Sequence, residues 1–115
     1  MPRSPGWWLV ALVVVSACGP RPLPPASPLD TPDAHYREGL ALLDAGDLWG
    51  AQAAFERVHG LAPDHPGSYV GSALVAMEQG EYHRALQEVE EALHRDRRCA
   101  DAYIARGRVL TAQGR

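Results

Sequence analysis

Residues 46–80 read GDLWGAQAAFERVHGLAPDHPGSYVGSALVAMEQG and hold one full period of an internal repeat. The repeat is marked by glycines that follow one another 34 residues apart, at Gly46, Gly80 and Gly114. Two further columns of small residues keep the same register: Gly39, Ala73 and Gly107 form one, and Ala51 and Ala85 form the other. Several independent columns in one register indicate a repeat architecture, in which each period is one structural unit.

Each period holds two amphipathic segments, which run from about residue 33 to 45 and from about 48 to 61 in the first unit. Gly46 lies between them and is a typical C-terminal helix breaker, able to take a positive φ. In the second segments, apolar residues recur at i, i+4 and i+7, as on one face of a helix. These stripes are Ala51, Phe55 and Val58 in one unit and Ala85, Val89 and Ala92 in the next. Pro63 ends the first unit, because proline cannot donate to the helix ladder. The pattern predicts antiparallel helical hairpins.

The composition of residues 33–115 favours helices over strands, since alanine, leucine and glutamate are common there while aromatic and β-branched residues are sparse. These 83 residues suffice for one small domain. All 11 basic residues are arginine and the net charge is −3, which argues against nucleic-acid binding. We therefore expect one all-α domain without a nucleic-acid partner.

The repeated residues resemble the tetratricopeptide repeat. The small, apolar and proline positions that characterise this family fall on Gly39, Ala51, Phe55, Val58, Leu61 and Pro63. The second unit has Arg95 and Arg97 where leucine and proline are expected, and the third unit stops after one helix. About two and a half units therefore cover residues 33–115. The resemblance implies an all-α fold in which antiparallel hairpins stack as a short solenoid.

The resemblance also implies that a peptide or protein partner binds along the concave side, which the first helices of the hairpins form. On helical spacing, eight residues would face this groove: Tyr36, Leu40, Leu43, Val70, Leu74, Met77, Ile104 and Arg108. Four carboxylates would edge it, namely Asp33, Asp44, Glu78 and Asp101. Such a groove suits an amphipathic helix or an extended segment with a few basic residues. The alternative is that these apolar residues pack against the neighbouring repeat.

The N-terminus has the layout of a secretory signal peptide, with Arg3 in a short polar start and an unbroken apolar run at residues 7–15. As a helix, this run rises only about 14 Å at roughly 1.5 Å per residue, less than half of a hydrocarbon core of about 30 Å. It is too short to span a membrane comfortably. The small residues Ser16 and Ala17 precede Cys18, as a signal peptidase site requires.

Residues 15–18, VSAC, resemble the lipobox of bacterial lipoproteins. This resemblance implies cleavage after residue 17 and lipid attachment to Cys18, which would anchor the chain to a membrane. Gly19 stands where an aspartate often marks inner-membrane retention, so we expect the outer membrane, facing the periplasm, rather than the inner membrane. The alternatives are an ordinary secreted protein, an uncleaved anchor, or a cytosolic protein whose true start lies further along the chain.

Residues 18–32 connect this anchor to the repeats and hold six prolines, which block helix hydrogen bonding and favour an extended polyproline conformation. The expected domain organisation is a signal peptide at residues 1–17, the lipid-anchored Cys18 and a proline-rich linker at 18–32, and the repeat domain at 33–115.

The sequence offers no motif for catalysis or for a metal. None of the five histidines belongs to an HExxH motif, and Cys18 and Cys99 form no CxxC pair. Glu91 and Arg95 fit a solvated i, i+4 ion pair. We expect Cys99 to be a small, partly buried residue at a repeat boundary, with an intermolecular disulfide as the alternative. The chain is thus expected to be no enzyme and to hold neither metal nor cofactor.

These features together predict an envelope-anchored scaffold or adaptor that binds other proteins, and the setting we expect is the assembly of pili, secretion or outer-membrane machinery. The alternative is an accessory or activating subunit of a cell-wall enzyme. A third possibility is that the sequence is the N-terminal piece of a longer protein with its own catalytic domain.

Overall fold

The structure is a computed structural model that describes residues 29–114. These residues form five helices and no strand. The helices are α2 (Pro32–Asp44), α3 (Leu48–Leu61), α4 (Pro66–Glu78), α5 (Tyr82–Arg95) and α6 (Ala100–Ala112). The expected signal peptide, Cys18 and all but the end of the expected linker lie outside the described residues. Among the helices that the structure describes, none combines the length and apolar character needed to cross a membrane.

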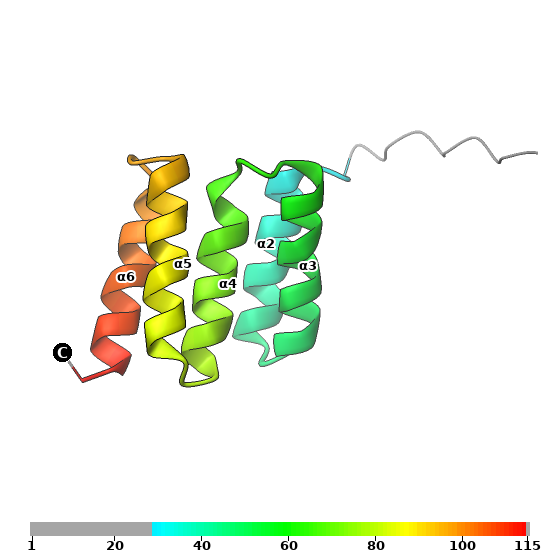
Figure 1. The fold of residues 1–115 in the computed structure, drawn as a ribbon. Helices are drawn as coiled ribbons and strands as arrows, with labels where there is room; N and C mark the ends of the chain where they lie inside the picture. The colour runs from blue at the N-terminus through cyan, green and yellow to red at the C-terminus, as the bar shows by residue number, and fades with distance from the viewer. Residues whose placement is uncertain (1–28, 115) are drawn as a thin grey trace, which may run out of the picture.

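The helices stand beside one another, with the hairpin of α2 and α3 at one end, α4 and α5 in the middle and α6 at the other end (Figure 1). α2 pairs with α3, and α4 pairs with α5, each as an antiparallel hairpin. α4 lies in the middle of the stack and packs against every other helix. The predicted all-α solenoid of stacked hairpins is therefore confirmed, with α6 as the single helix of the third unit.

The helix ends follow from local capping. The Thr31 side chain caps α2 by accepting a hydrogen bond from the backbone N–H of Ala34 at 3.2 Å, and proline occupies the first helical position. The Asp47 side chain caps α3 by accepting from the backbone N–H of Gly50 at 2.9 Å. Between the two helices, Gly46 has a φ of 83°, which confirms that it is the predicted helix breaker.

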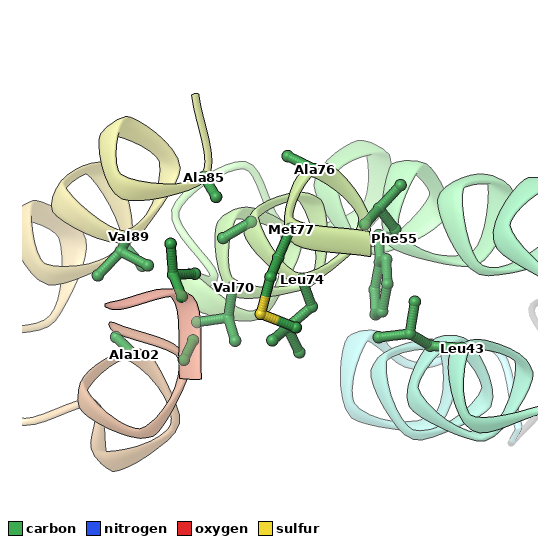
Figure 2. Close-up of a cluster of buried hydrophobic side chains, with 14 of the residues drawn as sticks. Leu43, Phe55, Val70, Leu74, Ala76, Met77, Ala85, Val89 and Ala102 are labelled. Carbon is green, nitrogen blue, oxygen red and sulfur yellow. The ribbon is translucent and has the colours of Figure 1, made fainter. Parts of the chain in front are cut away.

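The core lies between the first helices of the units, α2, α4 and α6, and the second helices, α3 and α5. Small residues allow these helices to approach closely. The Phe55 ring of α3 is 1% exposed and sits between α2 and α4, where a Cβ added to Gly39 or Gly71 would overlap it. The predicted stripe of α5 is fully buried, at Ala85, Val89 and Ala92. Figure 2 shows Phe55 and Val89 on opposite sides of the α4 residues Val70 and Leu74. One continuous apolar cluster therefore joins the hairpins.

The turn between α5 and α6, at the end of the second unit, lacks the proline found in the first unit but is still held by hydrogen bonds. The Asp96 side chain accepts a hydrogen bond from the backbone N–H of Arg98 at 2.9 Å. The Arg95 guanidinium lies 4.7 Å above the centre of the Tyr69 ring and donates to Glu91 at 2.6 Å, which confirms the predicted ion pair. Cys99, just beyond this turn, is partly buried and forms no disulfide within residues 29–114.

Candidate functional site

A groove of about 170 Å³ lies on the side of the stack that α2, α4 and α6 form. The backbones of α2 and α6 each lie against α4 but not against one another, so that α4 forms the floor and the other two helices form the walls. The lining residues are Tyr36, Leu40, Val70, Leu74, Asp101, Ile104, Ala105 and Arg108.

The repeat itself brings these side chains together. Six of the eight predicted groove residues line this cavity, and they occupy two columns of the 34-residue period. One column is Tyr36, Val70 and Ile104, and the other is Leu40, Leu74 and Arg108. Within each helix the two positions are four residues apart and therefore share a face. Stacking of equivalent helices then aligns the three faces.

The six residues differ in exposure according to the position of their helix. Val70 and Leu74 on α4 are 1% and 3% exposed, because α4 is covered from both sides. Tyr36 and Leu40 on α2 are half-buried, whereas Ile104 on α6 is 60% exposed and Arg108 is also exposed. The side chains that a partner reaches most easily are thus those of the walls. The prediction that these residues bind a partner is not tested by the structure.

The remaining two predicted residues, Leu43 and Met77, do not line the groove. They are 8% and 9% exposed and belong to the core, where the Met77 side chain lies beside Leu74 and Val70 (Figure 2). We expected an exposed inner face at these two positions, and the structure buries them because the neighbouring helices cover this part of the face.

A hydrogen bond links the two walls. The Tyr36 hydroxyl on α2 donates to the Asp101 carboxylate on α6 at 2.9 Å, although the residues are 65 positions apart in the chain. Burial, followed by the hydrogen bond to Asp101, holds the pKa of the Tyr36 hydroxyl well above its ordinary value. The hydroxyl therefore remains protonated and able to donate throughout the neutral range.

A second cavity, of about 350 Å³, adjoins the groove and shares Tyr36 and Asp101 with it. Its other lining residues are Asp33, Arg37, His65, Pro66, Gly67 and Cys99. The Nδ1 atom of His65 accepts from the backbone N–H of Gly67 at 3.0 Å, which leaves Nε2 to donate to Asp33 at 3.0 Å. His65 thereby caps α4 and holds the Asp33 carboxylate at the mouth of this cavity.

The charges along the groove are unevenly placed. Asp33 and Asp101, which were expected to edge the groove, lie at the end with the second cavity, together with Arg37. Arg108 lies further along α6, about 10 Å from Asp101 at roughly 1.5 Å rise per residue. The other two expected edge residues, Asp44 and Glu78, are exposed but line neither cavity. The groove is therefore apolar in its centre, net acidic at one end and basic at the other.

A further exposed surface escaped the sequence reasoning. Trp49 at the start of α3 is 91% exposed and borders a cavity of about 500 Å³ between the turns of the two hairpins, with Asp47, Gln52, Val75 and Arg84. The sequence did hold a signal for this surface. Position 49 falls outside the apolar stripe of α3, and a large aromatic side chain such as tryptophan is unusual on a helix face that only contacts solvent.

Within residues 29–114, no group of three histidine, cysteine, aspartate or glutamate side chains is placed to hold a metal ion. The polar groups around the groove instead bind one another, as with Tyr36 and Asp101 or His65 and Asp33.

Comparison with known proteins agrees with this geometry. The family model of the tetratricopeptide repeat matches residues 42–108, which is more than half of the chain and includes α3, α4 and α5 completely. Repeats of this type generally mediate protein–protein interaction, so the chain carries a protein-interaction fold. No curated protein matches the chain. The chain belongs to the tetratricopeptide repeat family.

Proposed function

We propose that the chain is a lipid-anchored scaffold of the bacterial envelope that holds a segment of a partner protein in the groove between α2, α4 and α6. The observation that carries the proposal is the alignment of two repeat columns into one apolar groove with opposite charges at its ends. Assembly of pili, secretion or outer-membrane machinery is the setting we propose for this scaffold, and its role there is binding rather than catalysis.

The chemistry of the groove defines the segment that fits it. Apolar side chains of the segment would lie against Leu40 and Ile104, over the floor that Val70 and Leu74 form. An acidic residue would pair with Arg108, and a basic residue would lie toward the acidic end. This order of charges gives the segment one preferred direction in the groove.

The anchor proposal rests on the sequence before the repeats. The lipobox-like residues 15–18 would place lipid on Cys18, and the first helix that the structure describes, α2, begins at Pro32. An extended linker between them could hold the groove up to about 40 Å from the membrane surface at roughly 3.1 Å per residue. A groove at that height would meet partners beyond the lipid headgroups.

Site-specific crosslinking tests the groove. Cells would produce the full chain with a photo-crosslinking amino acid at Ile104, or at Arg57 on α3 as a control site that lines neither cavity. We expect a defined adduct from position 104 alone. Arg108→Glu should abolish this adduct, whereas Arg106→Glu, the same charge reversal on the same helix but outside the groove, should not. The proposal is wrong if the adduct forms equally from both sites or survives Arg108→Glu.

Metabolic labelling tests the anchor. Cells grown with an alkyne-bearing palmitate should label the full chain, and Cys18→Ser should remove the label and retain the longer precursor. The intact mass of the purified protein should place the lipid on an N-terminal Cys18. If the protein stays unlabelled, or if its mature N-terminus lies elsewhere, the proposed lipid anchor is wrong, and the proposed binding role of the groove is not affected.

A further inference from the structure

The cavity beside Trp49 lies at the edge of the stack where both hairpins turn (Figure 1). We call it the turn cavity. Its volume is about 500 Å³, and its lining residues are Gly46, Asp47, Leu48, Trp49, Gln52, Val75, Gln79 and Arg84. None of these residues lines the groove between α2, α4 and α6. The turn cavity is therefore a separate surface, which a second ligand could occupy while the groove is filled.

Trp49 faces the solvent rather than the core. It is 91% exposed, and within residues 29–114 its indole ring stacks on no other ring and its N–H group donates no hydrogen bond. The equivalent position in the second unit is His83, so the repeat does not require a tryptophan here. An exposed indole offers a flat apolar surface with one hydrogen-bond donor at its edge. Both are available to a ligand.

Three polar side chains of the turn cavity retain unused hydrogen-bonding groups. The amide of Gln79 bonds to no group in residues 29–114. Arg84 donates to Glu81 through Nη1 at 3.0 Å, which leaves the Nη2 group without a partner in the same residues. Gln52 donates through Nε2 to Glu56 at 3.1 Å, which leaves its Oε1 atom able to accept. Donors and acceptors are thus presented together, as a ligand with several hydroxyl groups requires.

The charges favour a ligand without net charge. Residues 44–49 and 78–84, which hold the two turns, carry four carboxylates against one arginine and therefore repel anions such as phosphates. That arginine is Arg84, whose guanidinium lines the cavity and repels a cation. The opposite charge in the lining, Asp47, already accepts a hydrogen bond from the backbone N–H of Gly50 at 2.9 Å. A neutral ligand avoids both repulsions.

A glycan has the matching chemistry. One face of a pyranose ring consists of weakly positive C–H groups, which stack on the negative face of an indole, while its hydroxyls both donate and accept. The cavity volume lies within the range of about 300–1,000 Å³ that is usual for small-ligand pockets. An apolar peptide fits less well, because only Leu48 and the 4% exposed Val75 add large apolar side chains beside Trp49.

We propose that the turn cavity binds a neutral glycan, with one sugar ring stacked on Trp49 and its hydroxyls bonded to Gln52, Gln79 and Arg84. This binding site is independent of the groove. With both surfaces occupied, the chain would hold a protein segment and a glycan at the same time.

Tryptophan fluorescence tests the site directly. Trp7→Phe and Trp8→Phe leave Trp49 as the only indole of the full chain, which would be purified in detergent. The probes are two uncharged trisaccharides, cellotriose and the β-1,4-linked trimer of N-acetylglucosamine, whose rings expose an apolar face. We expect a saturable change in Trp49 emission with at least one of them. Added salt should leave the affinity unchanged, because the ligand carries no charge.

Calorimetry of variants assigns the binding to the turn cavity. Trp49→Ala should weaken it about tenfold and Gln79→Ala about fivefold. The matched control is His83→Ala, at the equivalent position of the second unit but outside the cavity, which should bind as the unchanged chain does. Because Trp49 is almost fully exposed, its replacement should not move the thermal midpoint, so weaker binding would not reflect unfolding.

Two kinds of result would overturn the proposal. The first is the absence of saturable binding with both trisaccharides, or equal binding to Trp49→Ala. The second is binding of tetralysine in place of the sugars, weakened by salt and lost in Trp49→Ala, which would assign the cavity to a cationic partner instead.

Discussion

Two glycines in the same column of the repeat should respond in opposite directions to the same substitution. Gly39 on α2 and Gly107 on α6 are both helical, so alanine brings each helix about 1 kcal/mol of intrinsic propensity. At Gly107 the added methyl meets no atom of residues 29–114 within 4 Å, whereas at Gly39 it overlaps the buried Phe55 ring. Overpacking of this kind costs about 1–3 kcal/mol, because the ring is held from both sides.

Gly107→Ala should therefore stabilise the chain by about 1 kcal/mol, and Gly39→Ala should destabilise it by about 1 kcal/mol after the propensity gain is included. For a domain of this size each kilocalorie moves the thermal midpoint by about 4–8 °C, so the two variants should melt about 8–16 °C apart. Circular dichroism melts and urea titrations of the full chain would measure both.

A second substitution separates overlap from other causes. Phe55→Leu alone should destabilise the core, but combined with Gly39→Ala it should cost clearly less than the two single changes added together, because the smaller side chain makes room for the methyl. Strict additivity, or a Gly39→Ala variant that melts as high as Gly107→Ala, would refute the reasoning that the Phe55 ring fixes the distance between α2 and its neighbours.

Three further outcomes are expected. Tyr36→Phe should lower the free energy of unfolding by about 1 kcal/mol, measured by urea titration, because it removes a hydrogen bond to Asp101 that is partly open to water; an unchanged midpoint would mean that the bond contributes nothing. Gly80→Ala should destabilise the chain by about 1–2 kcal/mol, since its φ of 77° is unfavourable for any L side chain, and Gly80→Asn should lose less. The pKa of His35 is raised, chiefly by its hydrogen bond to Asp30, whose own pKa that bond lowers. The pair should therefore stabilise the fold most at pH values between the ordinary pKa of aspartate and the ordinary pKa of histidine, and the contribution should fade as the pH rises through the raised pKa of His35. Melts at pH 5.5 and pH 8 should show a larger deficit of His35→Gln at the lower pH, and an equal deficit at both would exclude the coupling.

The helices were predictable because their signals are local. The stripe that contains Phe55 and the breaker at Gly46 depend on residues within about two turns of each other, so the expected segments of the first unit and the observed helices α2 and α3 agree within a residue. The convergence of Tyr36, Val70 and Ile104 was also predictable, since a constant period forces equivalent residues into one row.

Exposure was less predictable because it depends on the neighbours of a helix. Val70 and Ile104 share a column, yet one is 1% exposed and the other 60%, since α4 is covered on both sides and α6 is not. The same reason explains why Met77 lies in the core. The hydrogen bond from Tyr36 to Asp101 depends on the distance between two walls that only the folded stack sets, and no local pattern encodes it.

That hydrogen bond has a consequence for how the stack unfolds. Repeat arrays generally hold together through contacts between adjacent units, so a terminal unit can detach while the rest stays folded. Tyr36 belongs to the first unit and Asp101 to the third, and their bond passes over the unit between them. Release of α6 from the end therefore also disturbs α2 at the other end. An array closed in this way should lose these units together rather than unzip from α6.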